Sequence, residues 1–216
     1  MTTEIRAVLW DFGGVILSSP FEAFNRYEAE CGLPRDFIRR LNATNPDSNA
    51  WALLERSAIG VEQFYQLFEA EARQAGHALD AREVISRLSG DIRPEMVEAL
   101  RRVRSRYKTA CLTNNVLSGE GPGMARSPER ARQIAEIMTL FDCVVESSRV
   151  GVRKPEPRFY EIACEMLAIE PTQAVFLDDL GINLKPAKAM GMRTIKVSRS
   201  IEAIVELETI LGHSLR

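Results

Sequence analysis

Two short apolar runs in this chain end in acidic residues, and this arrangement constrains the fold more than any other feature. Ala7–Trp10 leads into Asp11, and Ala174–Leu177 leads into Asp178 and Asp179. Short apolar runs that are bounded by turn residues are typical of buried strands in a parallel sheet. Because open α/β sheets bind ligands beyond the carboxyl ends of their strands, we expect the three carboxylates to converge at one edge of a sheet.

Three carboxylates at one place repel one another unless a cation joins them. A hard divalent cation such as Mg²⁺ takes carboxylate oxygens as its ligands in proteins. The positions of Asp11, Asp178 and Asp179 therefore predict an active site that holds a metal ion, with Mg²⁺ as the expected cofactor.

The rest of the chain predicts an α/β fold with a helical insertion. Residues 18–89 show apolar residues at helical spacing and no comparable strand, and strand–helix alternation resumes near Asp91. Strands separated by helices indicate crossover connections and a parallel sheet. We therefore expect a Rossmann-like, doubly wound parallel sheet as the core, residues 1–17 and 90–216, with an α-helical cap, residues 18–89, inserted after the first strand. The later strands are expected at 109–113, 143–146, 174–177 and 194–197, and the helices at 94–106, 128–140, 156–167, 184–190 and 201–211.

The expected cap is rich in aromatic residues. Trp51, Phe64, Tyr65 and Phe68 exceed what the core of a small bundle requires, so we expect some of them to line the substrate entrance. Aromatic residues at helical spacing also pack readily in cores, which is the simpler reading of the same pattern.

Composition excludes several classes of partner. A net charge of −2 favours neither nucleic acid nor an anionic membrane. No apolar stretch is long enough to span a bilayer, and the N-terminus lacks the basic and apolar segments of a signal peptide, so a cytoplasmic location is expected.

The four scattered cysteines, Cys31, Cys111, Cys143 and Cys164, are expected to be buried free thiols. The glycines of residues 115–127 do not match a dinucleotide fingerprint, and a mobile loop is expected there.

Polar residues follow four successive expected strands. They are Asp11, the Thr113–Asn115 run, Lys154, and the Asp178–Asp179 pair. This order resembles the haloacid dehalogenase superfamily, whose members mostly hydrolyse phosphate esters. The resemblance is strongest to the N-terminal phosphatase-like domain of soluble epoxide hydrolase and to related domains of acyl-CoA dehydrogenase family proteins. It is carried by residues 112–114, 146–151, 154–157, 175–179 and 183–187.

The resemblance implies a role for each of these residues. Asp11 would be the nucleophile that attacks a small phosphorylated substrate, and Lys154 would balance the charge of Asp11 and of the phosphoryl group. Thr113 and Asn114, together with Lys154, would bind the phosphate. The metal would be held by Asp11, the carbonyl group of Gly13, Asp178 and Asp179. Asn183 would support the site by positioning Lys154 or the water of the metal ion.

One position departs from the pattern of the superfamily. Its phosphatases usually carry a second Asp two residues after the nucleophile, which protonates the leaving group and activates water, and this chain has Gly13 there. Because general acid–base catalysis typically contributes about 100- to 10,000-fold, we expect weak activity on alkyl phosphates. Two alternatives stay open: a metal-independent 2-haloacid dehalogenase, and a catalytically impaired protein that binds a phosphorylated ligand or a protein partner.

Overall fold

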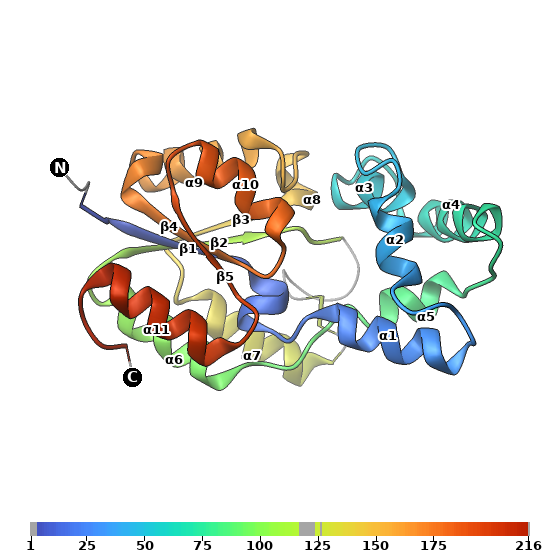
Figure 1. Ribbon diagram of the computed structural model, residues 1–216, viewed down its shortest axis with the longest axis horizontal. Coiled ribbons are helices and arrows are strands. Elements are labelled where there is room, and N and C mark those ends of the chain that lie inside the picture. Colours follow the sequence, from blue (N-terminus) through green and yellow to red (C-terminus); the bar gives the residue numbers. More distant parts are fainter. Residues whose placement is uncertain (1–3, 117–123, 126, 216) are drawn as a thin grey trace.

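A five-stranded parallel sheet forms the centre of the molecule. The computed structural model describes residues 4–116, 124, 125 and 127–215, so the expected loop at 115–127 lies largely outside the described residues. The strand order is β3-β2-β1-β4-β5 (Figure 1). The strands are β1 (Ala7–Trp10), β2 (Lys108–Thr113), β3 (Cys143–Glu146), β4 (Ala174–Asp178) and β5 (Arg193–Lys196). All of the pairs are parallel, which confirms the predicted α/β fold class.

Helices cover both faces of this sheet. The helices α6 (Pro94–Arg104), α7 (Pro128–Met138) and α11 (Ser200–Leu211) lie on one face, and α9 (Pro157–Leu167) and α10 (Gly181–Ala189) lie on the other (Figure 1). Val8 and Trp10 of β1 pack against the first group, whereas Ala7 and Leu9 pack against the second. Because every residue of β1 is buried on one face or the other, the strand reads as a continuous apolar run.

The predicted helices are confirmed, with small shifts at their ends. Pro94, Pro128 and Pro157 each occupy a first position of a helix, where the missing N–H group costs nothing. The hydroxyl group of Ser127 accepts a hydrogen bond from the Arg130 backbone N–H and caps α7. Helix α10 begins at Gly181, earlier than predicted, and the short helix α8 (Ser147–Val150) was not predicted.

A helical insertion follows β1 and has an apolar core of its own. It consists of α1 (Pro20–Glu30), α2 (Phe37–Ala43), α3 (Ala50–Glu55), α4 (Val61–Gln74) and α5 (Ala81–Ser86), and it lies beside the carboxyl end of the sheet (Figure 1). The ring centroids of Trp51 and Phe64 are 5.5 Å apart, and those of Phe64 and Phe68 are 5.0 Å apart. Phe64 and Phe68 are fully buried and fill the core of the insertion, so these two do not line an entrance. Tyr65 is only partly buried, and for it the expectation stays a prediction.

The two linkers of the insertion pair with each other. Leu17 and Ile92 form an antiparallel bridge, and the backbone N–H of Ser18 donates to the carbonyl oxygen of Asp91 at 2.7 Å. The N–H of Asp91 donates to the hydroxyl of Ser18 at 2.9 Å. A Cβ atom at Gly90 would lie 2.3 Å from the carbonyl oxygen of Ser18, so glycine permits this close approach. The division into a core domain and a cap domain stays a prediction. The boundary between the two domains would lie in these linkers.

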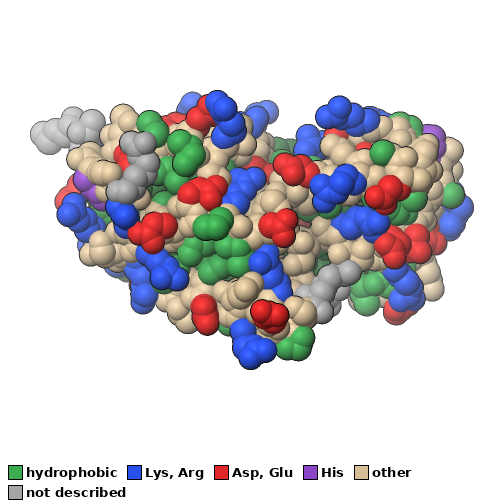
Figure 2. Space-filling model, turned by 90° about the horizontal axis from the view of Figure 1, so that it is seen from below, with side chains coloured by type: hydrophobic (Ala, Val, Ile, Leu, Met, Phe, Trp, Pro, Cys, Tyr) green, Lys and Arg blue, Asp and Glu red, His purple; other side chains and the backbone are tan. Residues whose placement is uncertain are grey.

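The surface of the molecule agrees only partly with the predictions made from the sequence. Cys111, Cys143 and Cys164 are buried free thiols, but Cys31 is exposed because it ends α1, so the expectation is wrong for that residue. On the face that Figure 2 shows, acidic and basic side chains are interspersed. None of the helices in the described part of the chain has both the length and the hydropathy needed to cross a membrane.

Candidate active site

Strand register brings the predicted carboxylates together. Trp10 of β1 lies opposite Leu177 of β4, and the N–H of Asp11 donates to the carbonyl oxygen of Leu177 at 2.8 Å. The next residues, Asp11 and Asp178, are therefore neighbours, and Asp179 follows. Asp11, Asp178 and Asp179 each present one carboxylate oxygen, and these oxygens lie within 4.8 Å of one another. The predicted convergence of the three carboxylates at the carboxyl edge of the sheet is confirmed.

Lys154 joins two of these carboxylates. Its Nζ atom lies 2.7 Å from Oδ1 of Asp11 and 2.8 Å from Oδ2 of Asp178, and the side chain is only 1% exposed. Burial alone would lower the pKa of Lys154, but the charges of Asp11 and Asp178 raise it well above its ordinary value. Lys154 is therefore a permanent, fixed cation between two strand ends.

The carboxyl groups of the cluster are held in an unfavourable electrostatic environment. Burial raises the pKa of Asp11 well above its ordinary value; Lys154 opposes this shift, and the other two carboxylates add to it. Burial and the charge of Asp178 raise the pKa of Asp179 to about 6. A hard cation would relieve this repulsion, and the all-oxygen donor set of the three side chains fits Mg²⁺.

Two adjacent glycines follow Asp11, and they serve different purposes. Gly14 has φ of 79°, and a Cβ atom there would lie 2.3 Å from the carboxyl group of Asp179. Gly14 therefore allows Asp179 to approach the turn after β1. Gly13 has φ of −70° and ψ of 131°, a conformation open to any residue, and a Cβ atom there would meet no atom within 4 Å. The backbone does not require glycine at position 13.

Asn183 orients the fully buried Asp178. Its Nδ2 atom donates to both carboxylate oxygens of Asp178 at 3.0 Å, and the N–H of Leu180 donates to Oδ1 at 2.8 Å. The hydroxyl of Tyr160 in turn donates to the carbonyl oxygen of Asn183 at 2.7 Å. Asn183 thus fixes the carboxylate that holds Lys154, which is an indirect form of the positioning that the resemblance implied.

Thr113 and Asn114 differ in what their side chains can still bind. Thr113 is buried at the end of β2, and its hydroxyl has no hydrogen-bond partner among the residues that the structure describes. Both donors of the Asn114 amide are used: Nδ2 donates to the carbonyl oxygen of Lys154 at 3.0 Å and to Glu55 at 3.2 Å, while Oδ1 accepts from the N–H of Lys154 at 2.9 Å. Asn114 therefore holds the main chain of Lys154.

Three features of the site were not predicted from the sequence. The hydroxyl of Ser19, in the first linker, donates to Oδ2 of Asp179 at 3.0 Å. Glu55 reaches Asn114 from the helical insertion. The amide of Asn115 donates to the buried carboxylate of Glu146 at 2.8 Å and ties the end of β2 to that of β3. Each depends on a contact between distant segments, for which the sequence carries no local pattern.

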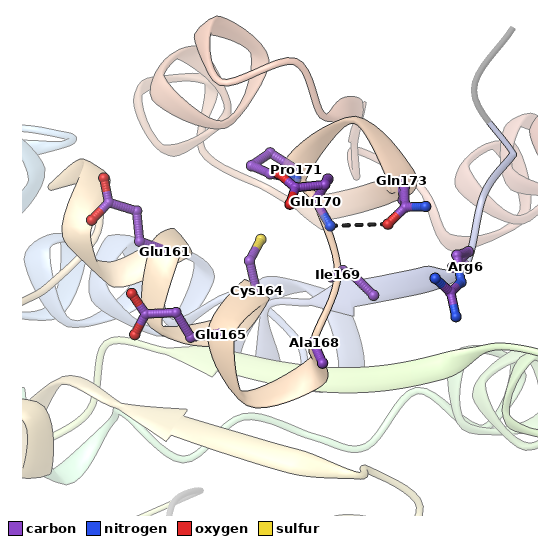
Figure 3. Close-up of a pocket in the computed structure, with 9 residues that line it drawn as sticks. All are labelled: Arg6, Glu161, Cys164, Glu165, Ala168, Ile169, Glu170, Pro171 and Gln173. Atoms are coloured by element: carbon purple, nitrogen blue, oxygen red, sulfur yellow. Dashed lines mark hydrogen bonds between the residues drawn. The ribbon is translucent and has the colours of Figure 1, made fainter.

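A separate surface pocket of about 620 Å³ lies at the opposite end of the strands. It is lined by residues that precede β1 and β4, among them Arg6 and Gln173, and by Glu161, Cys164 and Glu165 of α9 (Figure 3). Ligands of open parallel sheets bind at the carboxyl ends of the strands. This pocket adjoins the amino ends of β1 and β4 and is not part of the carboxylate site.

Curated relatives resemble this chain along nearly its whole length. Acyl-CoA dehydrogenase family member 10 of Mus musculus is 33% identical over 97% of this chain and 19% of its own length. Bifunctional epoxide hydrolase 2 of Mus musculus is 31% identical over 96% of this chain and 39% of its own length. The chain thus spans less than half of these two proteins. Phosphatase MT3486 of Mycobacterium tuberculosis is 30% identical, with 91% of this chain and 89% of that protein covered.

Solved structures share the fold, and a family model assigns the chain. A haloacid dehalogenase family enzyme of Bacteroides thetaiotaomicron, in complex with magnesium and inorganic phosphate, has a TM-score of 0.58 and 18% identity over 89% of this chain and 93% of its own. L-2-haloacid dehalogenase of Xanthobacter autotrophicus has a TM-score of 0.61 and 19% identity over 95% and 83%. The model for haloacid dehalogenase-like hydrolases matches residues 5–191. With Asp11, Lys154 and the two further aspartates gathered at the carboxyl edge of its sheet, the chain belongs to the haloacid dehalogenase-like hydrolases.

Proposed function

We propose that this protein hydrolyses phosphate monoesters of small molecules in a Mg²⁺-dependent reaction that passes through an aspartyl-phosphate on Asp11. The observation that carries the proposal is the placement of Lys154 between Asp11 and Asp178, with Asp179 completing a cluster of three carboxylates. The relative named as a phosphatase and the fold neighbour crystallised with magnesium and phosphate support the same chemistry.

The residues of the chain account for the first half of such a reaction. A carboxylate oxygen of Asp11 attacks phosphorus, the bond from phosphorus to the leaving oxygen breaks, and the phosphoryl group stays on Asp11. Lys154 offsets the negative charge that faces Asp11, and the hydroxyl of Thr113, which binds no other described residue, donates to a phosphoryl oxygen. Mg²⁺, held by Asp11, Asp178, Asp179 and the carbonyl oxygen of Gly13, would neutralise further charge on the phosphate. Water then hydrolyses the aspartyl-phosphate and restores Asp11.

Gly13 determines which substrates react. It has no proton to give, so the leaving oxygen must depart as an anion, and aryl and acyl phosphates should react faster than alkyl phosphates. It also has no base to activate water, so hydrolysis of the aspartyl-phosphate becomes the slow step and an initial burst of product is expected. Asn114, whose two amide donors are both used within the protein, acts by holding Lys154 rather than by binding phosphate.

A dehalogenase is the second candidate. Two observations favour it: a solved 2-haloacid dehalogenase shares the fold, and the reaction that displaces a halide needs no proton donor at position 13. The tandem Asp178–Asp179 pair favours the metal-dependent phosphatase, because a metal-independent enzyme gains nothing from a third carboxylate in this repulsive cluster. A protein that binds a phosphorylated ligand without turnover is the remaining alternative.

One set of assays separates the three candidates. An aryl phosphate, an acyl phosphate and an alkyl phosphate are each incubated with the protein in the presence of Mg²⁺ or of a chelator, with Asp11→Asn as the inactive control. Phosphate release that requires Mg²⁺ and Asp11 supports the proposal. Chloride release from 2-chloropropionate in the presence of chelator supports the dehalogenase. A rise in melting temperature with inorganic phosphate and Mg²⁺, without turnover of any compound, supports the binding protein.

A further inference from the structure

The end of helix α3 contacts the segment that carries Lys154. Ser57 donates through its hydroxyl to the carbonyl oxygen of Ser148 at 2.8 Å, and Arg56 forms an ion pair with Glu156 at 2.8 Å. Glu55 forms an ion pair with Arg153 at 2.6 Å. Three consecutive residues of the helical insertion therefore bind residues 148–156, which pass through the active site.

Glu55 is the most deeply buried of these three residues of the insertion. Its side chain is only 9% exposed, and both of its carboxylate oxygens have partners. The indole Nε1 of Trp51 donates to Oε1 at 3.0 Å and fixes the orientation of the carboxylate from within the insertion. Oε2 then faces the amide Nδ2 of Asn114 at 3.2 Å and the guanidinium of Arg153. Oε1 of Glu55 is thus bound from the insertion, while Oε2 is bound by residues of the core.

Asn114 links Glu55 to Lys154 by hydrogen bonds. Its amide accepts from the N–H of Lys154 and donates to the carbonyl oxygen of Lys154, so it holds both main-chain groups of the residue whose Nζ atom meets Asp11. The chain of contacts runs from Trp51 and Glu55 in the insertion, through Asn114 at the end of β2, to Lys154 and Asp11.

We propose that Glu55 is a positioning residue that fixes Lys154 against Asp11 through Asn114, so that the site is complete only while the helical insertion is seated on the core. The proposal rests on the proposed function, because it assigns the pair of Lys154 and Asp11 to catalysis. Loss of Glu55 releases Asn114 and leaves the position of Lys154 less defined. Misplacement of a reacting group by about 1 Å can cost roughly 100-fold in rate.

A double-mutant cycle tests whether Glu55 acts through Asn114. Glu55→Ala and Asn114→Ala should each lower kcat by about tenfold or more, and the double variant should be no slower than Asn114→Ala alone. Glu55→Gln retains an oxygen that can accept from Asn114, and it should lose less than the alanine variant. Glu62→Ala is the matched control. Glu62 is also a glutamate of the insertion that forms an ion pair, but its side chain is exposed and its partner, Arg82, lies within the insertion. Additive losses, or a change confined to KM, would overturn the proposal.

Hydrogen exchange gives a readout that does not depend on turnover. Amide exchange of residues 148–156 should accelerate in Glu55→Ala and in Glu55→Gln to a smaller extent, and it should be unchanged in Glu62→Ala. If the wild type hydrolyses no phosphate but exchange in this segment responds to Glu55, the proposed function fails while the positioning contact stands. If the wild type is active and the two glutamate positions behave alike in both kinetics and exchange, Glu55 has no positioning role.

Discussion

The ammonium group of Lys154 lies 2.7 Å from the carboxylate of Asp11, and both side chains are almost completely removed from solvent. The same ammonium meets Asp178 at 2.8 Å, so one cation is shared by two buried anions. Removal of the cation would leave two carboxylates unpaired in a place where water cannot compensate them.

Lys154→Met should therefore abolish turnover and also destabilise the fold. Loss of one partner from a buried ion pair typically costs about 3–5 kcal/mol in the free energy of unfolding. Urea unfolding monitored by circular dichroism measures this loss. Lys188→Met, at an exposed position of α10, is the control and should change the free energy of unfolding little. A Lys154→Met protein as stable as the control would show that the two carboxylates do not depend on the lysine.

Mg²⁺ should stabilise the protein through Asp179. A ligand that binds only the folded state raises the free energy of unfolding, by about 2.7 kcal/mol when its concentration is 100 times its dissociation constant. The melting temperature should therefore rise with millimolar Mg²⁺, and Asp179→Asn should remove most of this rise. Asp47→Asn, in an exposed loop of the helical insertion, should respond as the wild type does. Equal responses of all three proteins would exclude Asp179 as a ligand.

The two glycines after Asp11 should respond differently to substitution. Gly13→Asp should fold normally, because its Cβ atom meets nothing within 4 Å, and it should raise turnover of an alkyl phosphate by roughly 100-fold. Gly13→Ala should fold equally well without this gain. Gly14→Ala should lose at least about 1 kcal/mol of stability, because its φ is positive and its Cβ atom would meet Asp179. A folded Gly13→Asp protein that stays inert on every phosphate would disprove the missing proton donor as the cause.

Glu55 should make stability depend on pH in a defined direction. Burial raises the pKa of Glu55, while Arg153 and Trp51 oppose the shift. Because the pKa is higher in the folded than in the unfolded chain, the folded state binds the extra proton. The contribution of Glu55 to the free energy of unfolding is therefore fully present at low pH and declines as pH rises through the raised pKa. As the pH falls through this raised pKa towards the ordinary pKa of a glutamate, the difference in melting temperature between wild type and Glu55→Gln should move in favour of the wild type. A difference that does not vary with pH would contradict the raised pKa.

The parts of the site that the sequence predicted correctly share one property, which is proximity to a strand end. Asp11 and Asp178 follow residues that are paired in register, so the positions of two short apolar runs were enough to predict that these carboxylates lie together. Lys154 required the resemblance to a known family, because it lies after β3 in a segment without regular structure. Ser19 and Glu55 could not be found in either way, since Ser19 reaches the site from the first linker and Glu55 from the helical insertion, each by a contact between distant segments.

The aromatic residues of the insertion also show what a sequence pattern cannot predict, which is the identity of the surface that covers a helix. Trp51, Phe64 and Phe68 have the spacing of a buried helical face, and the structure uses them for that purpose. The spacing of apolar residues indicates which face of a helix is covered but not what covers it. The burial of Phe64 and Phe68 in the core of the insertion therefore could not be distinguished from a place at a substrate entrance until the neighbouring helices were positioned.

The pairing of Ser18 with Asp91 has a consequence for how proteins of this architecture diversify. Since these residues are already hydrogen-bonded to each other, the ends of the insertion are joined at the sheet regardless of what lies between them. The entropic cost of closing such a loop rises only slowly with its length. Helices can thus be lengthened, shortened or exchanged between these two residues while the strand register that aligns Asp11 with Asp178 is preserved. The chemical step is kept only where the contact of Glu55 with Asn114 survives such changes, so substrate range can evolve within that one constraint.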